Sequence, residues 1–546
     1  MGTEIQKRLN IKETELGKPT RVQQFKFKEE TEESIIKLID KIRSDVAVGY
    51  DDINARLMKD TKNTIATTLK QLVNLSYKKS TFPACMKKAI VRAVHKKDDT
   101  EEPSNYRPLS ILSTLSKIFE RSATNQLISY LEENSLLNET QHAYRKGHST
   151  QTCLSEIVNY IYRENDDGNV VGIASLDLSK AFDSVNHSHL LQKLNDLGLN
   201  NSSLEWCKSY LTGRTQKTKF RKYMSSEETV TSGVPQGSIL GPILFICFMN
   251  DMPKNFNNCK IISYADDTQI MISAKSSKQI KKKLESLICA AQKWYTENSL
   301  LNNATKTEVM LISRRKKNKE KFDINVFDEG KMKTLKLKES IKLLGVHLDE
   351  ELNWNRQINE VNKKARNAVR NLQRVNLLLP QKSRMLLYNS LVATHFNYAD
   401  TVWGGCNIKN KNKLQRTQNA AVKSMMGMKK DEPSEEALKK ANLLPLEEKR
   451  NIHEAVYIHK GLNGKLPKTI TKQYQEQLSL KQNRSAERRI LIIPKHKTEH
   501  FKSSPLYRTV KTWNAIPPQI KEAEISTFKQ KYQTYIHTYV HSTSKH

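Results

Sequence analysis

The chain has 546 residues, with 91 Lys and Arg against 58 Asp and Glu, so its formal net charge is +33. With 37% hydrophobic residues, 27% charged residues, 18 Gly and 15 Pro, it is neither collagen-like nor wholly disordered. An excess of positive charge of this size destabilises the folded chain by self-repulsion unless a polyanion neutralises it. Nucleic acid is therefore the first partner to expect.

Membrane insertion and thiol chemistry are both disfavoured. The longest apolar stretch, 239–249, is interrupted by Gly241 and Pro242 and is far shorter than the roughly 20 residues that cross a bilayer. The N-terminus is polar and charged, unlike a secretory signal, and the seven cysteines lack zinc-like or disulfide-like spacing. We therefore expect an intracellular protein, in the cytoplasm and the nucleus, with no membrane association.

Helical periodicity dominates the first part of the chain. After about two dozen polar residues, apolar residues recur at helical spacing from Ile35, and another helix-like stretch covers 65–75. The middle of the chain changes character, because 170–178 is a strand-like run and 260–273 is typical of two short strands. This pattern predicts a mixed α/β centre.

The pattern becomes helical again over 354–428, with a pause at Pro380. Residues 429–433 are interpreted as a linker into a C-terminal region of mostly helical type. A mixed centre flanked by helical regions suits a catalytic core with nucleic-acid clamps, although a basic scaffold would have the same outline.

Two adjacent carboxylates lie between the two short strands. Apolar runs flank Asp266 and Asp267, which predicts a hairpin with both aspartates at its tip. Adjacent like charges are costly unless a cation neutralises them, and Mg²⁺ binds few protein carboxylates together with substrate phosphates. For an isolated Asp-Asp pair, simple turn chemistry is the commoner explanation.

Another carboxylate, Asp177, ends the strand-like run and precedes a helix from about Lys180. A strand end lets a side chain project into a site rather than into the core. Asp183, a few residues later, is interpreted as an early-helix charge that the helix dipole favours. Asp177 and the hairpin pair together could converge on two metal ions, which is the arrangement used for phosphoryl transfer.

These residues lie in segments that resemble a known family. The successive palm motifs of reverse transcriptases are matched by 175–187 (SLDLSKAFDSVNH), 232–242 (SGVPQGSILGP) and 264–267 (YADD). The fingers blocks of non-LTR (LINE-type) retrotransposons, nearest the Jockey-like and chicken-repeat-like branches, are resembled by 105–110 (NYRPLS) and 141–145 (QHAYR). Later palm blocks and regions after the polymerase core are resembled by 301–307, 343–349, 387–391, 398–404 and 512–517.

The resemblance implies an α+β right-hand polymerase with fingers, an antiparallel palm sheet, a thumb, and helical N- and C-terminal extensions. The expected divisions are an N-terminal extension (1–83), fingers and palm (84–350), a thumb (351–428) and a C-terminal region (429–546). The implied activity is RNA-directed DNA synthesis, in which dNTPs are added to a primer 3′-hydroxyl on an RNA template with two Mg²⁺ ions, or Mn²⁺ as a substitute.

By the same resemblance, the DNA primer is a nicked target strand. The sequence as given leaves no segment for the endonuclease found upstream in intact elements, so we expect either a 5′-truncated copy or gene-model fragment, or a separate endonuclease as a partner. Three alternatives stay open: an RNA-copying RNA polymerase, a catalytically inactive or truncated relic that only binds RNA or DNA, and a basic scaffold protein.

Residue by residue, the resemblance implies that Asp177, Asp266 and Asp267 are the catalytic, metal-binding aspartates. Phe182 matches the aromatic position that crowds a ribose 2′-hydroxyl and so favours deoxynucleotides. Without the motif, a Phe beside a helix would most simply be a core residue.

The Gly-rich segment that begins at Gly233 lacks the Lys of a Walker loop, so it predicts no P-loop ATPase. Gly233 and Gly237 would allow a close approach of the backbone to a nucleotide, and Gln236 would offer a directional amide to the substrate. Read alone, this segment is an ordinary turn before an apolar helix.

Cations in the fingers match those that close over the triphosphate in enzymes of this type. They are Arg107 and either Lys96 or Lys97, and guanidinium geometry suits a bidentate phosphate grip. The family usually has Gly after the paired lysines, whereas Asp98 follows here. Lys306 resembles a later-palm lysine that would protonate the departing pyrophosphate.

Overall fold

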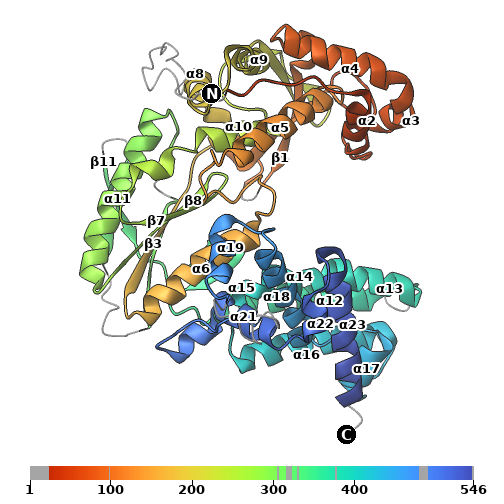
Figure 1. Cartoon of the computed structure of the whole chain (residues 1–546), viewed down its shortest axis with the longest axis vertical. Coiled ribbons are helices and arrows are strands. Elements are labelled where there is room, and N and C mark those ends of the chain that lie inside the picture. The colour runs from red at the N-terminus through yellow and green to blue at the C-terminus, as the bar shows by residue number, and fades with distance from the viewer. Residues whose placement is uncertain are drawn as a thin grey trace.

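The structure is a computed structural model of the whole chain, and it describes residues 24–96, 99–303, 306–314, 322–328, 331–375, 378–478 and 490–543. Helices from the N-terminal part lie at one end of the molecule, and helices from the C-terminal part lie at the other (Figure 1). Between them is a sheet flanked by α6 (Thr150–Asp166) and α11 (Ser277–Glu297).

The N-terminal helices pack on helices that come later in the chain. The predicted helix near Ile35 is α2 (Glu32–Asp40), which begins where the Thr31 hydroxyl accepts a hydrogen bond from the Ser34 amide. Phe27 stacks on Tyr77 at a centroid distance of 4.5 Å, which fixes the entering segment. The other helices of this part are α3 (Ala55–Asp60), α4 (Lys62–Lys78), α5 (Ser116–Glu133), α8 (His187–Asp196), α9 (Asn201–Leu211) and α10 (Gly241–Phe248).

A mixed sheet lies beside these helices, with strand order β2-β1-β4-β5 and β6 paired to β4. β1 pairs antiparallel with β2 and parallel with β4, so the strand Arg214–Phe220 joins a hairpin that ends about a hundred residues earlier. Its strands are β1 (Lys88–His95), β2 (Tyr106–Leu112), β4 (Arg214–Phe220), β5 (Tyr223–Met224) and β6 (Glu228–Val230).

The central sheet is fully antiparallel, in the order β7-β8-β3-β9. Its strands are β3 (Val170–Leu176), β7 (Lys260–Tyr264), β8 (Asp267–Ala274) and β9 (Glu308–Ile312). Along β3, Val170 and Ala174 face the core that contains α11, whereas Val171 and Ile173 face the core that contains α6. Burial on both faces explains why this strand is apolar without alternation.

The close packing of β3 against α11 explains why residue 172 is a glycine. A Cβ atom there would overlap the side chain of Ile280 and would lie 2.9 Å from Leu284, both on α11. The missing side chain therefore lets α11 approach the sheet closely.

The helices after the sheet form a second hydrophobic core with it. The predicted pause is real, because α12 (Asn355–Val375) precedes Pro380 and α13 (Gln381–Leu387) begins directly after it. This part also contains β10 (Asp323–Asp328), β11 (Lys331–Lys336), β12 (Ser340–Leu343), β13 (Val346–Asp349), α14 (Thr394–Asn397), α15 (Asp400–Trp403), α16 (Ile408–Met426) and α17 (Ser434–Lys440).

The interpreted linker at 429–433 lies between α16 and α17, which pack against each other. The second core continues through Ala437 and Leu438 on α17, so buried packing does not stop at this turn. The domain divisions given above therefore stay predictions.

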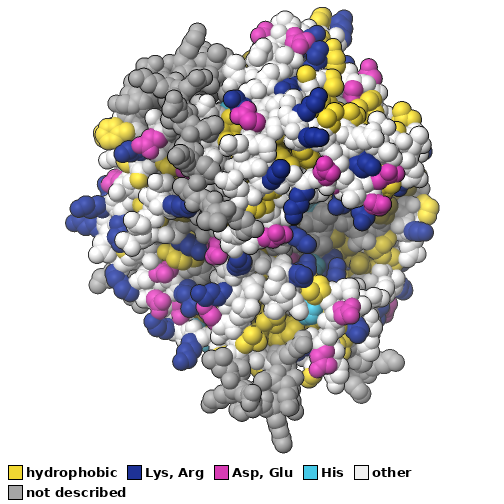
Figure 2. Space-filling view, turned by 45° about the horizontal axis from the view of Figure 1, so that its top comes forward, with side chains coloured by type: hydrophobic (Ala, Val, Ile, Leu, Met, Phe, Trp, Pro, Cys, Tyr) yellow, Lys and Arg dark blue, Asp and Glu magenta, His cyan; other side chains and the backbone are white. Residues whose placement is uncertain are grey.

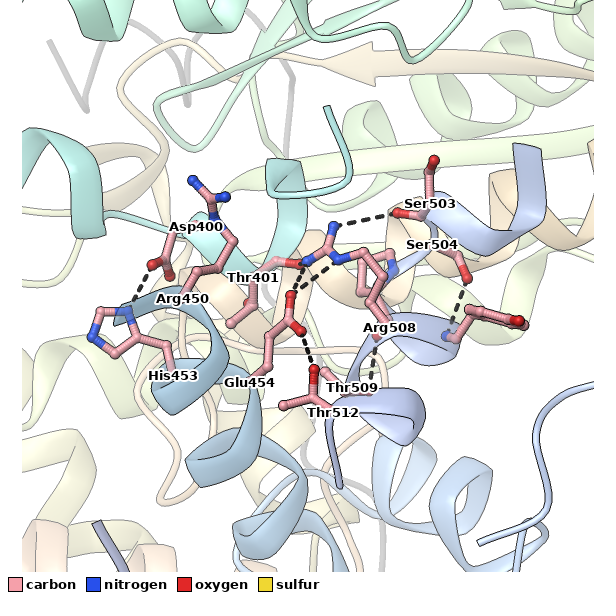
Figure 3. Close-up of polar contacts among 12 residues, drawn as sticks. Asp400, Thr401, Arg450, His453, Glu454, Ser503, Ser504, Arg508, Thr509 and Thr512 are labelled. Carbon is pink, nitrogen blue, oxygen red and sulfur yellow. Dashed lines mark hydrogen bonds and ion pairs between the residues drawn. The ribbon is translucent and has the colours of Figure 1, made fainter. Parts of the chain in front are cut away.

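The C-terminal helices form a third core and are joined to the rest by buried polar contacts. They are α18 (Leu446–Leu462), α19 (Lys468–Gln475), α21 (Pro505–Asn514), α22 (Pro518–Lys521) and α23 (Ile525–Thr543). Figure 3 shows Arg508 on α21 between Glu454 on α18 and the backbone oxygen of Thr401 on α15, which accepts over 2.7 Å. The same view shows His453 beside Asp400, and His453 Nδ1 lies 2.6 Å from an Asp400 carboxylate oxygen.

The helices, the antiparallel central sheet and the mixed sheet together make this an α+β protein, as predicted. In the part of the chain that the structure describes, no helix combines the length and the apolar character needed to cross a bilayer. Figure 2 shows Lys and Arg side chains spread over the viewed face, and several of them border a hollow. This distribution agrees with a polyanionic partner.

Candidate active site

The aspartate pair lies where the sequence predicted it, at the tip of a hairpin. In the β7–β8 pairing, Lys260 lies opposite Met271 at one end and Tyr264 lies opposite Asp267 at the other. Ala265 and Asp266 therefore form the turn. Ala265 has a φ of +57°, an uncommon left-handed conformation for a residue with a side chain.

The register of the sheet brings Asp177 to the same place. β3 pairs with β8 as far as Leu176 opposite Thr268, so the next step places Asp177 opposite Asp267. Directly opposed residues on neighbouring antiparallel strands have Cβ atoms about 4.5–5.5 Å apart. The Asn303 amide donates to the Asp177 carbonyl oxygen over 3.0 Å, which holds the chain where it leaves the strand.

A cavity of about 850 Å³ collects almost all of the predicted site residues. Its walls come from the β1–β2 hairpin, the ends of the central strands, residues 177–183, and the segment that leads into α10. The predicted residues that line it are Lys96, Arg107, Asp177, Phe182, Gln236, Gly237, Asp266, Asp267 and Lys306. Lys97 lies outside the described residues.

The carboxylates of this cavity repel one another. Burial, followed by the charges of Asp266 and Asp177, raises the pKa of Asp267 to about 6. Burial and Asp177 also raise the pKa of Asp266, against which Arg107 and then Lys96 act in the opposite direction. Burial and mutual repulsion thus both disfavour the charged forms of these two carboxyls.

Cations approach the aspartates from two sides. Lys306 Nζ lies 3.7 Å from an Asp177 carboxylate oxygen, and both side chains are partly exposed. On the other side, Arg107 is in β2 and Lys96 follows the end of β1, where its amide donates to the Asn105 carbonyl oxygen over 2.9 Å. A triphosphate between these groups would meet positive charge at both ends.

Phe182 packs on a core residue and lines the cavity. It lies on α7 (Ala181–Ser184), and its ring stacks on Phe245 at a centroid distance of 4.4 Å and an interplanar angle of 15°. Its other side lines the cavity. A ring braced by the core can act as a fixed steric wall.

The Gly-rich segment packs closely against other parts of the chain's own backbone. At Gly233 (φ +86°) a Cβ would lie 2.7 Å from the Asp183 carbonyl oxygen, and at Gly237 (φ +125°) it would overlap the Ser110 carbonyl oxygen. Both glycines therefore permit close approach to the chain's own backbone, and their close approach to a nucleotide stays a prediction. Gly237 also lines the cavity, so its contact with substrate stays a prediction.

Gln236 and Asp183 are partners in the cavity wall. Gln236 Nε2 donates to both carboxylate oxygens of Asp183, over 2.9 and 2.8 Å. The backbone carbonyl oxygen of Gln236 accepts from the Ser110 amide over 2.7 Å. Asp183 lies in the first turn of α7, as interpreted, but burial raises the pKa of its carboxyl. Its role thus includes holding the Gln236 side chain.

Sequence reasoning missed two residues of the site. Tyr144 lines the cavity with a φ of +58°, and burial together with the charge of Asp266 raises its pKa. The buried side chain of Gln141 bonds to the backbone of the turn that carries Asp266. Both lie in the 141–145 block that resembles a fingers motif, which was the available signal.

A strand-end aspartate lies opposite a hairpin aspartate pair and faces cations from a second sheet, an arrangement consistent with a right-hand polymerase fold. Residues 94–348 match the family model described as reverse transcriptase (RNA-dependent DNA polymerase). This part of the chain is therefore a reverse transcriptase domain, as the motifs indicated, and reverse transcriptases generally depend on divalent metal ions.

Two of the similar curated proteins are RNA-directed DNA polymerases of mobile elements from Drosophila melanogaster. The RNA-directed DNA polymerase from mobile element jockey is 28% identical over 411 residues, which are 73% of this chain and 44% of that protein. The probable RNA-directed DNA polymerase from transposon BS is 27% identical over 407 residues, 72% of this chain and 44% of that protein. The chain thus spans less than half the length of these relatives.

Among solved structures, telomerase from Candida albicans in complex with a fragment of telomeric RNA matches with a TM-score of 0.35 and 14% identity. The match covers 71% of this chain and 68% of that chain.

Proposed function

We propose that this chain is an RNA-directed DNA polymerase of the non-LTR retrotransposon type, which adds deoxynucleotides to a primer 3′-hydroxyl on an RNA template. The observation that carries the proposal is the single cavity in which Asp177, Asp266 and Asp267 face Arg107 and Lys306. Its volume of about 850 Å³ is in the range of small-molecule sites and suits a nucleoside triphosphate.

The three carboxylates fit two Mg²⁺ ions, with Mn²⁺ as a substitute, because these hard cations prefer oxygen ligands. Within the described ranges, no group of three or more His, Cys, Asp or Glu side chains that could hold a metal ion is found. Mg²⁺ commonly takes its remaining ligands from substrate phosphates and water. When bound, the ions would activate the primer hydroxyl and stabilise the pyrophosphate leaving group.

The other cavity residues would act on the incoming nucleotide. Arg107 and Lys96 would hold the triphosphate, and Phe182 would crowd a ribose 2′-hydroxyl so that a ribonucleotide fits poorly. The Gln236 amide, oriented by its bonds to Asp183, would support the nucleotide, and Lys306 would donate a proton to the departing pyrophosphate.

The proposed partners follow from this reaction. They are an RNA template, a DNA primer or nicked target DNA, dNTPs, and a separate endonuclease that makes the nick. A protein that copies RNA onto a nicked chromosomal strand would act in the cytoplasm and the nucleus.

A second candidate function is nucleic-acid binding without catalysis, as in a decayed element. The net charge of +33 favours it equally well, because phosphate contacts need only dispersed Lys and Arg. The two candidates differ in whether the aspartates matter.

The deciding experiment is primer extension by the full chain on an RNA template with a DNA primer, dNTPs and Mg²⁺. Asp266→Asn is the test variant, and Asp60→Asn, on the exposed end of α3, is the matched control. Extension that survives in Asp60→Asn and is lost in Asp266→Asn supports the polymerase. RNA binding with no extension by the parent supports the binding-only candidate.

A further inference from the structure

The turn that carries Asp266 lies at the edge of its sheet. β7 is an outer strand in the order β7-β8-β3-β9, so the hairpin tip is bonded to a neighbouring strand on one side only. Such a tip moves more easily than the centre of a sheet, whereas metal-dependent catalysis requires the carboxylate to be held in place.

The segment before α6 covers this open edge. The Ser263 amide donates to the Thr140 carbonyl oxygen over 2.9 Å, and the His142 amide donates to the Ser263 carbonyl oxygen over 2.8 Å. These bonds place Gln141 opposite Ser263 on β7, and Ser263 is two residues before Ala265 in the chain.

From there, the Gln141 side chain contacts both polar backbone groups of Ala265. Its Oε1 accepts from the Ala265 amide over 2.9 Å and from the Ala143 amide over 3.0 Å, and its Nε2 donates to the Ala265 carbonyl oxygen over 3.3 Å. Two N–H donors meet at Oε1, which fixes the orientation of the amide. Gln141 is only 7% exposed, so water does not compete for these bonds.

The segment that presents Gln141 is itself anchored. His142 Nε2 lies 3.2 Å from a Glu156 carboxylate oxygen, and the other oxygen of Glu156 lies 2.6 Å from Lys260 Nζ at the start of β7. Thr469 on α19 donates to Glu156 over 2.7 Å. The 140–142 segment, β7 and a C-terminal helix therefore meet at one buried carboxylate.

We propose that Gln141 is the positioning residue of the catalytic hairpin: its amide clamps Ala265 and thereby sets where the next residue, Asp266, presents its carboxylate to a divalent cation. This inference rests on the proposed function. Glutamine suits the position because one side chain must accept from an amide and donate to a carbonyl, which Met, Leu or an ionised Glu cannot do.

The test compares Gln141→Met, which keeps the length and removes both bonds, with Gln141→Asn, which keeps the amide but is one methylene too short. Gln418→Met is the matched control, because Gln418 is equally buried and bonds to Tyr388 and Leu444 in the helical part of the chain. The readouts are kcat, the KM for dNTP, the Mg²⁺ midpoint of extension, the melting midpoint, and Mn²⁺ affinity measured calorimetrically on the protein.

Loss of an outer residue that orients a metal ligand typically costs about 10- to 100-fold in metal affinity or activity. Both Gln141 variants should therefore lose about 10- to 100-fold in kcat and bind Mn²⁺ about tenfold more weakly, with KM for dNTP and RNA affinity near parental values. Gln418→Met should match the parent in kcat and Mn²⁺ affinity.

The clamp is refuted if a folded Gln141→Met protein keeps the parental Mn²⁺ affinity and Mg²⁺ midpoint, or if its activity loss only follows a lower melting midpoint. A parent that does not extend primers, yet binds Mn²⁺ in a manner that depends on Asp266 and Gln141, would overturn the proposed function and leave the clamp standing.

Discussion

The buried ion pair between Arg508 and Glu454 allows a quantitative prediction about how the C-terminal helices are attached (Figure 3). Arg508 Nε donates to Glu454 over 3.0 Å, a second N–H of the guanidinium bonds to the same oxygen, and Arg508 also donates to the Thr401 carbonyl oxygen over 2.7 Å. The side chains are 13% and 4% exposed, so water cannot replace a lost partner.

Arg508→Met leaves the Glu454 carboxylate buried without its cation. Removing one partner of a buried pair costs about 3–5 kcal/mol. For a domain of 150–250 residues, each kcal/mol lowers the melting midpoint by about 2–4 °C, so we expect a decrease of about 6–20 °C. Adding Glu454→Leu removes the isolated charge, so the double variant should regain most of the lost stability.

The assay is thermal unfolding followed by circular dichroism for the parent, both single variants and the double variant, read as a double-mutant cycle. Arg43→Met is the control, because Arg43 and Asp45 form a pair with side chains 78% and 67% exposed, and such pairs contribute about 0–1 kcal/mol. The reasoning is refuted if Arg508→Met is no more destabilising than Arg43→Met, or if the two changes at the buried pair are simply additive.

Four further outcomes follow from the cavity. Asp177→Asn removes a proposed metal ligand and should lower the extension rate by ~10³-fold or more in single-turnover assays, while RNA binding in a filter assay is unchanged. Because the pKa of Asp267 is raised from 3.8 to about 6, protons compete with the cation, and extension should rise as pH increases from about 5 to about 7; a flat pH–rate profile would contradict this. Because of the same raised pKa, the Asp267 carboxyl binds a proton more tightly in the metal-free folded protein than in the unfolded chain. The stability of the metal-free protein should therefore fall as pH rises from about 4 to about 6. In melting curves, Asp267→Asn should remove this pH dependence. Phe182→Val opens the wall braced by Phe245 and should improve ribonucleotide incorporation relative to dNTP by roughly 10- to 200-fold in competition assays, whereas an unchanged ratio would exclude the steric role.

Local patterns were sufficient for much of the site. An apolar run ending in Asp177, and two β-prone runs around Asp266 and Asp267, are short-range signals that a few neighbouring residues determine. The order of the motifs then related these separate segments to one family. In the structure, Arg107 and Lys306 line the same cavity as the three aspartates.

What local pattern could not supply is the partner of each polar side chain. Gln141 bonds to Ala265, which is 124 residues away, and Arg508 bonds to Glu454, which is 54 residues away. Such contacts depend on sheet register and on how helices pack, and neither leaves a periodic signal in the sequence.

The amino-acid sequence by itself determined the class of chemistry, because three aspartates in ordered motifs and a charge of +33 imply cations and a polyanion. The tertiary structure decided which groups hold those aspartates in place, including the Gln141 amide at Ala265, and why Gly233 and Gly237 are glycines. The physical reason is that a hydrogen bond or a steric overlap exists only once distant segments are packed to within a few ångströms of each other.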